Sequence, residues 1–466
     1  MHRASITRAV RFLVDQTIKT ARRPSRILSI TGYFFFQHDW PTAAWWCLKS
    51  SLRFGGPPIG EYLMAANCLY HGLGRFRDAV ALLGRANESN LKEAQRLGLA
   101  DTPFRVLDSV WTNHIGHTAE IDYVIKLGIL EGRKRDDTIL YVPPGSRVAN
   151  RFLLQQMAMQ LRLIEDPAEL PFPASAVQAL HYDLLGPRLP DKTTTYFWKI
   201  GGKTYARWHR EGRQPLFSFP PDVEARGWEA LRKAGMPQGA WFVALHVREG
   251  KWDGRNFGMH AVRNADVSTY FPAIAEIVDR GGWVVRMGDP GMTTLPPMPN
   301  VIDYCHSAMR TDWMDVFIVA RSRFMIGTNS GPAFIPALYG VPSVLTNWWP
   351  HGERPWQAAD VFIPKLLRSV TSERYLTMSE FLREPFSFCH SSRYLADREV
   401  KVEDNDPAVI KAAVVEMLER HGGDFAVSTE VADLRARADQ IYESNGVVGM
   451  SQLASEFCQR YSHLFR

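Results

Sequence analysis

Two stretches, 241-WFVALHVREG-250 and 326-IGTNSGPAFIPALYGVPSVL-345, decide the fold class of this chain. In the first, an apolar run is followed directly by polar residues. The second consists of an apolar run, a Thr-Asn-Ser-Gly turn, a helical segment, a glycine and another apolar run. Short apolar runs between turn signals predict strands that are buried on both faces. Because these strands alternate with helical segments, the sequence predicts a doubly wound parallel sheet covered by helices.

The same alternation continues on both sides of these stretches. In the second half we expect strands at 241–247, 283–288, 301–304, 323–328 and 342–347, and helices at 268–280, 311–320 and 332–339. In the first half we expect strands at 105–110 and 138–142 and helices at 116–130 and 148–161. Residues 165–220 contain many prolines and give no strand positions. The pattern predicts an α/β protein with two Rossmann-like lobes, joined near 220–238, and a cleft between them.

The first hundred residues show apolar positions three and four apart, which predicts helices. Within 62–88, two helical stretches flank the Gly72-Leu73-Gly74 turn, and this segment resembles one tetratricopeptide unit. No convincing second copy follows, so the segment is either a site for a protein partner or a helical cap on the next domain. We expect four parts: helices at 1–100, a first lobe at 101–235, a second lobe at 236–400 and a helical tail at 401–466.

The composition excludes several classes of protein. Of the 466 residues, 45% are hydrophobic and 22% are charged, as in folded globular proteins. No window reaches the roughly 18 uninterrupted apolar residues of a membrane span, and the N-terminus lacks the apolar core of a secretion signal. We therefore expect a cytoplasmic protein. Its basic N-terminus either touches the inner face of a membrane or forms the solvated face of a packed helix.

The cysteines and the net charge limit the kinds of metal site and ligand that the sequence indicates. The five cysteines are scattered without CxxC spacing, so they indicate neither a disulfide framework nor a zinc cluster, and we expect buried thiols. The net charge of +6 suits an anionic ligand such as a phosphate or a nucleotide, and it is too dilute to indicate nucleic acid. The Asp404-Asn405-Asp406 stretch is either a metal-binding motif or, with Pro407, the start of a helix.

The strongest candidate site lies where the strands of the second half end, because open α/β sheets bind ligands there. The strand 241–247 is followed by Arg248, and it carries His246 near its end. An arginine offers a fixed fork of donors that matches a diphosphate. The alternative for Arg248 is a salt bridge with Glu249.

Two further turns follow strands in the same half. Asn329, Ser330 and Gly331 stand at a predicted helix start, where free backbone donors favour an anion, although an ordinary helix cap explains the same residues. Gly288 and Asp289 end another strand and either contact a nucleotide or form a turn.

In the first half, the stretch 111–122 places four residues between a strand and a helix, on the side that faces the cleft: His114, Gly116, His117 and Glu120. A neutral histidine is a competent base near pH 7, so His117 is our candidate for taking a proton from an acceptor hydroxyl. A structural role is the alternative for either histidine. The aromatic stretch 347–351 either stacks on a sugar or base or packs at the lobe junction.

These residues resemble the GT-B glycosyltransferases. His246-Val247-Arg248 is similar to the His-x-Arg motif of the fucosyltransferase-like group, in which the arginine holds the diphosphate of a GDP-sugar. The turn at 329–331 resembles the phosphate-binding segment of heptosyltransferases. Gly116-His117 stands at the position where those enzymes carry a Gly-Asp dipeptide that supplies the catalytic base. Three segments most resemble a bacterial family found with surface-polysaccharide and flagellin-modification genes: 263–266, 285–288 and 326–331.

The resemblance implies a glycosyltransferase that moves a sugar from a nucleotide diphosphate sugar, with a GDP-sugar favoured, to a glycan, lipid-linked or protein acceptor. We expect the donor in the second lobe and the acceptor at the first. The expected reaction is an inverting displacement with His117 or Glu249 as base, with no cofactor and no metal, because fixed positive charge stabilises the leaving group. Two alternatives are a sugar-nucleotide epimerase on the same fold and a non-catalytic scaffold that acts through its helical segment.

Overall fold

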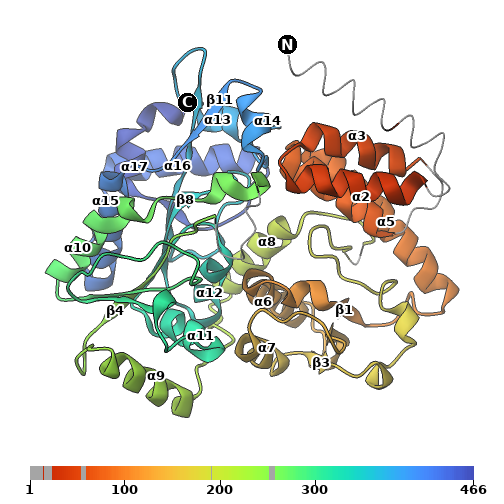
Figure 1. Cartoon of the computed structure of the whole chain (residues 1–466), viewed down its shortest axis with the longest axis horizontal. Helices are drawn as coiled ribbons and strands as arrows, with labels where there is room; N and C mark the ends of the chain where they lie inside the picture. Colours follow the sequence, from red (N-terminus) through yellow and green to blue (C-terminus); the bar gives the residue numbers. More distant parts are fainter. Residues whose placement is uncertain (1–13, 15–23, 54–58, 190, 251–257) are drawn as a thin grey trace.

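The computed structural model describes residues 14, 24–53, 59–189, 191–250 and 258–466. It contains two parallel sheets that lie in separate halves of the molecule (Figure 1). The smaller sheet has the order β1-β2-β3, and its strands are β1 (Arg105–Leu107), β2 (Thr138–Tyr141) and β3 (Arg162–Ile164). The larger has seven strands in the order β12-β9-β8-β7-β4-β5-β6. The predicted α/β class with two parallel-sheet lobes is therefore what the chain adopts.

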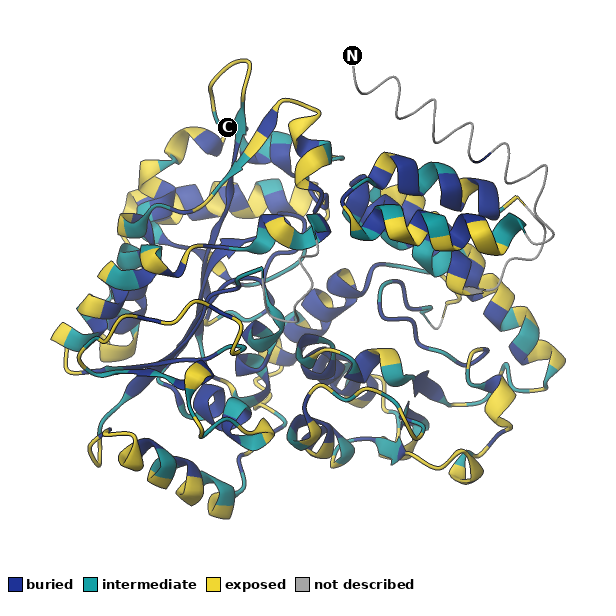
Figure 2. Ribbon diagram, viewed as in Figure 1, coloured by how far each residue is buried: buried dark blue, intermediate teal, exposed yellow. Residues whose placement is uncertain are grey.

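One interior strand of the larger sheet, β4, is the strand that the sequence marks most clearly. β4 (Phe242–His246) is buried along its whole length, as a strand covered on both faces must be (Figure 2). Its neighbours pair with it in parallel, with Leu245 opposite Arg286 on one side and His246 opposite Gly327 on the other. The other strands are β5 (Trp283–Arg286), β6 (Val301–Asp303), β7 (Met325–Gly327), β8 (Ser343–Trp348), β9 (Val361–Pro364) and β12 (Gln452–Leu453).

The helices of this lobe begin near the expected residues. Thr311 caps α11 (Asp312–Arg321) by accepting a hydrogen bond from the Met314 N–H at 3.3 Å. The sequence predicts a helix that starts at Ser268, but the cap is Asp266, whose side chain accepts from the Ser268 N–H at 2.8 Å in the turn that leads into α10 (Phe271–Asp279).

The predicted helix 332–339 is interrupted. A 3₁₀ turn, Gly331–Phe334, is followed by a single helical turn, α12 (Pro336–Tyr339). Pro336 has no N–H to donate within a continuous helix, so the regular hydrogen-bond pattern cannot run through it.

Residues 401–466 form part of the second lobe and not a separate helical tail. The segment contains β11 (Val400–Glu403), α15 (Pro407–Gly422), α16 (Thr429–Ser444), β12 and α17 (Ser455–Arg460). β12 joins the edge of the large sheet, with Gln452 opposite Val361. β11 pairs in an antiparallel manner with β10 (Leu366–Ser369). The helical pattern that predicted the tail forms two long helices, α15 and α16, because the chain turns at Gly423, whose φ is 83°.

The Asp404-Asn405-Asp406 stretch is the start of a helix. Asp406 caps α15 by accepting a hydrogen bond from the Ala408 N–H at 2.8 Å. The neighbouring residues have other partners: Asp404 pairs with Lys365, and Asn405 bonds to Asn347. The capping interpretation is therefore confirmed.

We expect Asp406→Ala to lower the free energy of unfolding by about 1 kcal/mol, because it leaves a helix-end N–H without its acceptor. Asp406→Asn should retain nearly all of the stability, since an amide oxygen caps equally well and the exposed Asp406–Arg460 pair contributes little. Urea unfolding of the three proteins measures both effects. Equal stability of the alanine variant would contradict the cap.

The first lobe packs three helices around its short sheet: α6 (Ile115–Leu130), α7 (Arg151–Ala158) and α8 (Phe197–Arg210). α6 contacts both of the others. α8 lies in the proline-rich region 165–220, for which no strands were predicted, and β3 begins directly after the expected helix 148–161. α9 (Pro221–Lys233) then leads into the second lobe (Figure 1).

The N-terminal part is helical, as expected. It contains α2 (Pro24–Gln37), α3 (Pro41–Ser51), α4 (Ile59–Asn67), a π-helical turn at Cys68–Gly72 and α5 (Phe76–Arg96). The turn between α4 and α5 rests on the second lobe, because Gly74, with φ of 61°, lies so close to Pro385 that a Cβ would overlap the Pro385 carbonyl. The helical part thus touches the second lobe directly. Of residues 1–23, only Val14 is described, so the basic residues of this segment lie outside the described part of the chain.

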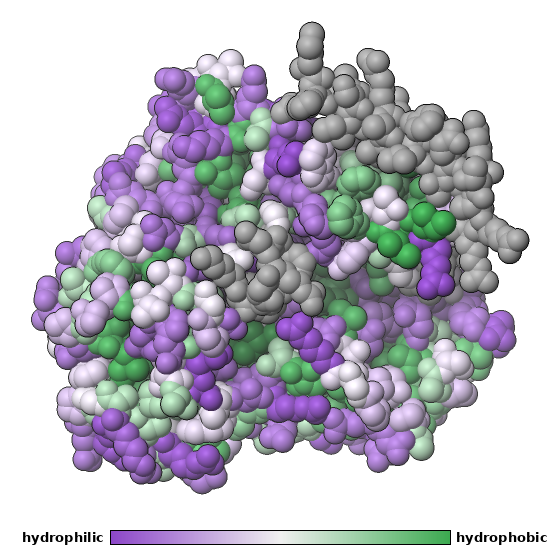
Figure 3. Space-filling view, viewed as in Figure 1, coloured by the Kyte–Doolittle hydropathy of each residue, from purple (hydrophilic) through white to green (hydrophobic). Residues whose placement is uncertain are grey.

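The surface of α2 carries the exposed side chains of Ile27, Ile30, Tyr33 and Phe34. Hydrophobic residues are visible in green over the N-terminal helices (Figure 3). Among the described residues, no helix combines the length and the apolar character needed to cross a membrane. The five cysteines are buried and unpaired.

Candidate functional site

The carboxyl ends of β4 and β7 meet at one edge of the large sheet. His246 and Gly327 are paired, so Arg248 and Asn329 each lie two residues beyond this pair. The Arg248 N–H donates to the Thr328 hydroxyl at 3.0 Å, which ties the two strand ends together. The structure therefore brings together the two stretches that the sequence singled out.

The Arg248 side chain is nearly buried and held in place by the turn Gly258–Arg263 and the residue after it. Its Nη1 donates to the His260 carbonyl at 3.0 Å and to the Asn264 side-chain oxygen. His246 is also buried, and burial together with Arg286 and Arg248 lowers its pKa to about 3. The imidazole of His246 is thus neutral beside a fixed positive charge.

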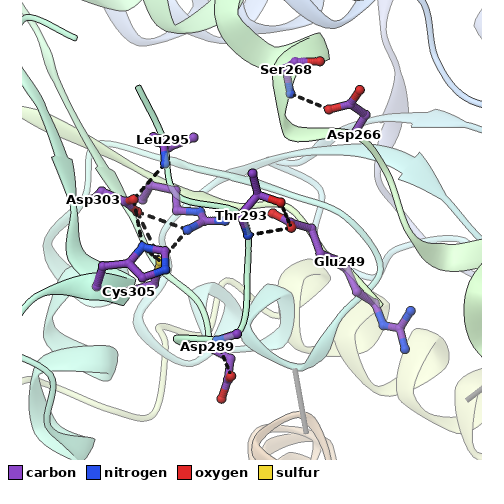
Figure 4. A network of polar contacts seen from close by, with 12 residues as sticks. Glu249, Asp266, Ser268, Asp289, Thr293, Leu295, Asp303 and Cys305 are labelled. Atoms are coloured by element: carbon purple, nitrogen blue, oxygen red, sulfur yellow. Dashed lines mark hydrogen bonds and ion pairs between the residues drawn. The ribbon is translucent and has the colours of Figure 1, made fainter. Parts of the chain in front are cut away.

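Glu249 has other partners than those expected from the sequence. One carboxylate oxygen accepts from Arg286 at 2.8 Å, and the other accepts from the N–H and the hydroxyl of Thr293 at 2.8 and 2.7 Å (Figure 4). Arg286 also pairs with Asp303 at 3.1 Å. Because both oxygens of Glu249 are occupied in this network, we assign Glu249 a structural role in place of the expected one as base.

Gly288 and Asp289 form a turn. The Asp289 side chain accepts from the Gly291 N–H at 2.9 Å, and Gly288 has a φ of 152°. Figure 4 shows Asp289 near the Glu249 network, with its side chain engaged in its own turn. These contacts agree with the turn interpretation of Gly288-Asp289.

The Ser330-Gly331 end is covered by the first lobe. Gly331 and Gly116 are in close contact, since a Cβ on Gly331 would lie 2.9 Å from the Gly116 nitrogen and 2.8 Å from Ile115 Cγ2. The backbone at 331 therefore faces α6 in place of an open anion site. The helix that follows is also only one turn long. Asn329 remains at the site, whereas Ser330 and Gly331 form the junction between the lobes.

We expect Gly331→Ala to lower the free energy of unfolding by about 1–3 kcal/mol, because the added methyl overpacks this junction. Gly60→Ala is the matched control: a Cβ there has nothing within 4 Å, and alanine favours the helix. Thermal and urea unfolding distinguish the two. A Gly331→Ala variant as stable as the Gly60→Ala variant would show that the lobes separate at this point in solution.

Arg263 is the functional candidate that we did not place in the site from the sequence. Its Nε and Nη2 donate to the Asn329 carbonyl at 3.0 and 2.8 Å, and Nη2 also reaches the Asn329 side chain at 3.1 Å. Burial lowers the pKa of Arg263, while the carboxyl groups of Glu353 and Glu120 act in the opposite direction. Among the described residues, no carboxylate is in ion-pair contact with its guanidinium. The only earlier signal was its place in the 263–266 segment.

Two buried carboxyl groups lie in the surroundings of Arg263. Glu353 accepts hydrogen bonds from the hydroxyls of Tyr70, at 2.5 Å, and Tyr196. Glu120, on α6, is 5% exposed, and within the described part of the chain its Oε2 has no hydrogen-bond partner. Burial, and secondly Glu353, raise the pKa of Glu120 well above its usual value. Burial therefore favours the neutral form of Glu120, and in that form the group can donate a hydrogen bond.

His117 lies one turn before Glu120 on α6, so both side chains project from the same face. Burial, and secondly the positive charge of a protonated His114, lower the pKa of His117 to about 3. Its Nδ1 is buried and lacks a hydrogen-bond partner among the described residues. His114 is exposed, and its ring centroid lies 5.0 Å from that of His117. The unoccupied nitrogen of His117 can receive a proton, but with a pKa of about 3 the imidazole is a weak base until a bound anion such as a diphosphate raises its pKa.

The aromatic stretch 347–351 packs the interior. Trp348 and Trp349 are 2% and 0% exposed, and their indole N–H groups donate to the carbonyls of Glu353 and Cys389. These contacts agree with the packing interpretation and leave no face of either ring open for a sugar.

Within the described part of the chain, two groups of side chains have the spacing of metal ligands. One is Asp303, Cys305 and His306, which belong to the Arg286 network in Figure 4. The other is His71, His260 and His390, which lie beside the Arg248 anchor.

Comparison with known proteins gives distant structural similarity. No family model and no curated protein matches the chain. A glycosyl transferase family 9 protein of Veillonella parvula aligns with 56% of this chain and 85% of its own, at 11% identity and a TM-score of 0.36. The iron-containing dodecameric glycosyltransferase TibC of enterotoxigenic E. coli aligns with 56% of this chain and 63% of its own, at 13% identity and a TM-score of 0.34. The glycosyltransferase SnogD of Streptomyces nogalater covers 76% of this chain and 79% of its own, at 13% identity and a TM-score of 0.20. Because these TM-scores are low, we argue the function from the residues of the site.

Proposed function

We propose that this protein is a glycosyltransferase that takes a sugar from a nucleotide diphosphate sugar. The observation that carries the proposal is the pair Arg248 and Arg263, which are brought to the ends of β4 and β7 where doubly wound sheets bind ligands. Arg263 has no contacting carboxylate among the described residues, so a half-buried positive charge is available for an anion. A guanidinium matches a diphosphate in shape and charge.

The residues on the opposite side supply proton chemistry. In the proposed step the acceptor hydroxyl oxygen attacks the anomeric carbon, and the bond from that carbon to the phosphate oxygen breaks. The nucleoside diphosphate leaves with the electron pair and is held by Arg248 and Arg263. The proton of the hydroxyl passes to Nδ1 of His117, and protonated Glu120 donates a hydrogen bond to the bound sugar. A direct displacement of this kind inverts the anomeric centre.

The resemblance of His246-Val247-Arg248 to the fucosyltransferase-like motif supports a GDP-sugar as donor. The proposed acceptor is a glycan, a lipid-linked sugar or a protein, and it approaches from the α6 side. A nucleotide-sugar epimerase is the second candidate, because Glu120 and Glu353 offer two buried carboxyl groups around one site. The two differ in their need for an acceptor.

The test is a thermal-shift and calorimetry screen of the full chain against GDP, UDP, ADP and CMP and their common sugars. We expect one nucleotide diphosphate to raise the Tm and to lose this effect in Arg263→Gln. Arg437→Gln, at an exposed position on α16, is the control for loss of a charge. Conversion of the bound sugar nucleotide without an acceptor would identify an epimerase. No binding by any nucleotide, with or without a glycan acceptor, would overturn both candidates.

A further inference from the structure

Three histidines that are far apart in the sequence meet beside the site. His71 belongs to the π-helical turn of the N-terminal helices, His260 to the turn after β4 and His390 to the loop before α14 (Ser392–Ala396). Their ring centroids are 4.4 Å apart for His71–His390, 5.1 Å for His260–His390 and 5.3 Å for His71–His260. One ring nitrogen of each lies within 4.8 Å of the other two.

This spacing fits a common metal ion. Imidazole nitrogens bind Zn²⁺ at about 2.0–2.1 Å. When the N–Zn–N angle lies between about 90° and the tetrahedral value, this bond length places the ring centroids about 4.5–5.2 Å apart. The three observed separations bracket this range closely. The rings are mutually inclined by 69–83°, as rings that converge on one point from different directions are, and not stacked.

The hydrogen bonds within the cluster do not provide a partner for every ring nitrogen of the three histidines. His260 Nδ1 and His390 Nδ1 share one contact of 2.9 Å. Within the described part of the chain, the buried atoms His71 Nδ1 and His390 Nε2 have no partner. Buried imidazole nitrogens without partners are costly unless something absent from the protein chain binds them. The unoccupied nitrogen of His71 is therefore available to a ligand, whereas the unoccupied nitrogen of His390 is not the one that faces His260.

The backbone around the cluster is fixed. The His390 N–H donates to the His71 carbonyl at 2.6 Å, which ties the N-terminal helices to the second lobe at this point. The His260 carbonyl accepts from Arg248 at 3.0 Å. Arg263 lies close enough to influence all three histidines, and Arg248 influences His260 and His390. The carboxyl group of Glu353 acts against the positive charge of Arg263. The three rings are thus held in place before any ion binds.

We propose that His71, His260 and His390 bind one divalent transition-metal ion, with Zn²⁺ as the reference ion. Three imidazoles are a ligand set that suits Zn²⁺ and its neighbours in the first row, and a fourth coordination position stays open for water or a phosphate oxygen. The sequence alone indicated no metal, because ligands at 71, 260 and 390 form no local motif. The inference does not depend on the proposed function.

The ion would have two consequences. It would hold the N-terminal helices to the second lobe, because His71 comes from one and His260 and His390 come from the other. It would also fix the His260 carbonyl that orients the Arg248 guanidinium. Removal of the metal is therefore expected to loosen both the helical part and the site, as happens when bound metal contributes to the folding free energy.

The experiment measures metal binding directly and without nucleotide. The full chain is stripped with a chelator and titrated with Zn²⁺ and with Co²⁺, whose visible absorption reports its coordination. Metal content is then determined on the dialysed protein. The test variants are His260→Ala and His390→Ala, with His260→Gln in case the alanine variant fails to fold. The controls are His351→Ala, which removes a buried imidazole elsewhere, and Cys305→Ser, which removes a ligand of the other candidate group.

We expect one ion per chain, an increase in Tm on its addition, and loss of both in the His260 and His390 variants but in neither control. The inference is overturned if the unmodified chain binds neither ion, because the cluster is then only a hydrogen-bonded histidine group. It is also overturned if binding persists in the histidine variants or disappears in Cys305→Ser, because the ion then lies elsewhere. Nucleotide binding is scored separately, so failure of this inference leaves the proposed function standing.

Discussion

Replacement of Arg248 by alanine is expected to lower the turnover of sugar transfer by a factor of about 10²–10³, the cost of removing one fixed donor to developing negative charge. The Arg248 guanidinium is positioned by the His260 carbonyl and Asn264, so it needs no reorganisation when the diphosphate departs. Arg248→Lys keeps the positive charge but loses the forked pair of donors, so we expect its kcat to lie between those of the unmodified chain and Arg248→Ala. The measurement is kcat with the donor identified by the binding screen.

The same variants separate a functional from a structural loss. Arg248→Ala leaves the His260 carbonyl and the Asn264 side chain without a donor, which costs stability by about 1–3 kcal/mol for a buried group. The fold should survive this cost, and far-UV circular dichroism should show it. Arg437→Ala removes an exposed arginine and should alter neither property. An unchanged kcat in folded Arg248→Ala would contradict the assignment of the diphosphate site.

The elements that the sequence predicted well are those whose pattern is local. β4 is a run of apolar residues that ends at Arg248, and a strand buried on both faces allows few other patterns. Thr311 and Asp406 were correct caps because a cap depends on the two or three residues that follow it. The interruption at Pro336 was visible in the same way, but we read the stretch as one helix.

Long-range pairing could not be read from the sequence. β12 joins the sheet through Gln452 and Leu453, a pair with no strand pattern, and its partner Val361 lies about ninety residues earlier. The contact between Gly116 and Gly331 depends on how the two lobes meet, which no local pattern encodes. For this reason Ser330-Gly331 looked like an open anion site in the sequence and is a lobe junction in the structure.

In the candidate site too, residues marked by a local pattern were predicted, and residues that depend on long-range contacts were not. Arg248 was found because a strand end marks it, whereas Arg263 is the last residue of a turn, and only its contacts with Asn329 identify it as a site residue. Glu249 stands beside Arg248 in the sequence, yet its side chain belongs to Arg286 on the neighbouring strand. Adjacent residues in an extended segment project to opposite sides, so neighbours in sequence need not share a site.

Arg286 is expected to be the arginine on which the fold depends. It is 0% exposed and pairs with Glu249 at 2.8 Å and with Asp303 at 3.1 Å. Arg286→Met keeps much of the volume but removes the charge between two partly buried carboxylates. Breaking a buried pair from one side costs about 3–5 kcal/mol, because the partner charges remain unpaired. We expect a loss of this size in urea unfolding, and the Arg437→Met control should show none.

The opposite roles of Arg286 and Arg248 can be tested by compensation. If Arg286 serves only to neutralise its partners, adding Glu249→Gln to Arg286→Met should recover part of the stability, because one unpaired charge is removed with it. No change at the nucleotide site should compensate Arg248→Ala in the same way, since its loss falls on the ligand. Arg286→Met that is as stable as the unmodified chain would mean that Glu249 and Asp303 are adequately solvated without it. Glu249 would then be free to serve as the base that its place beside Arg248 first implied.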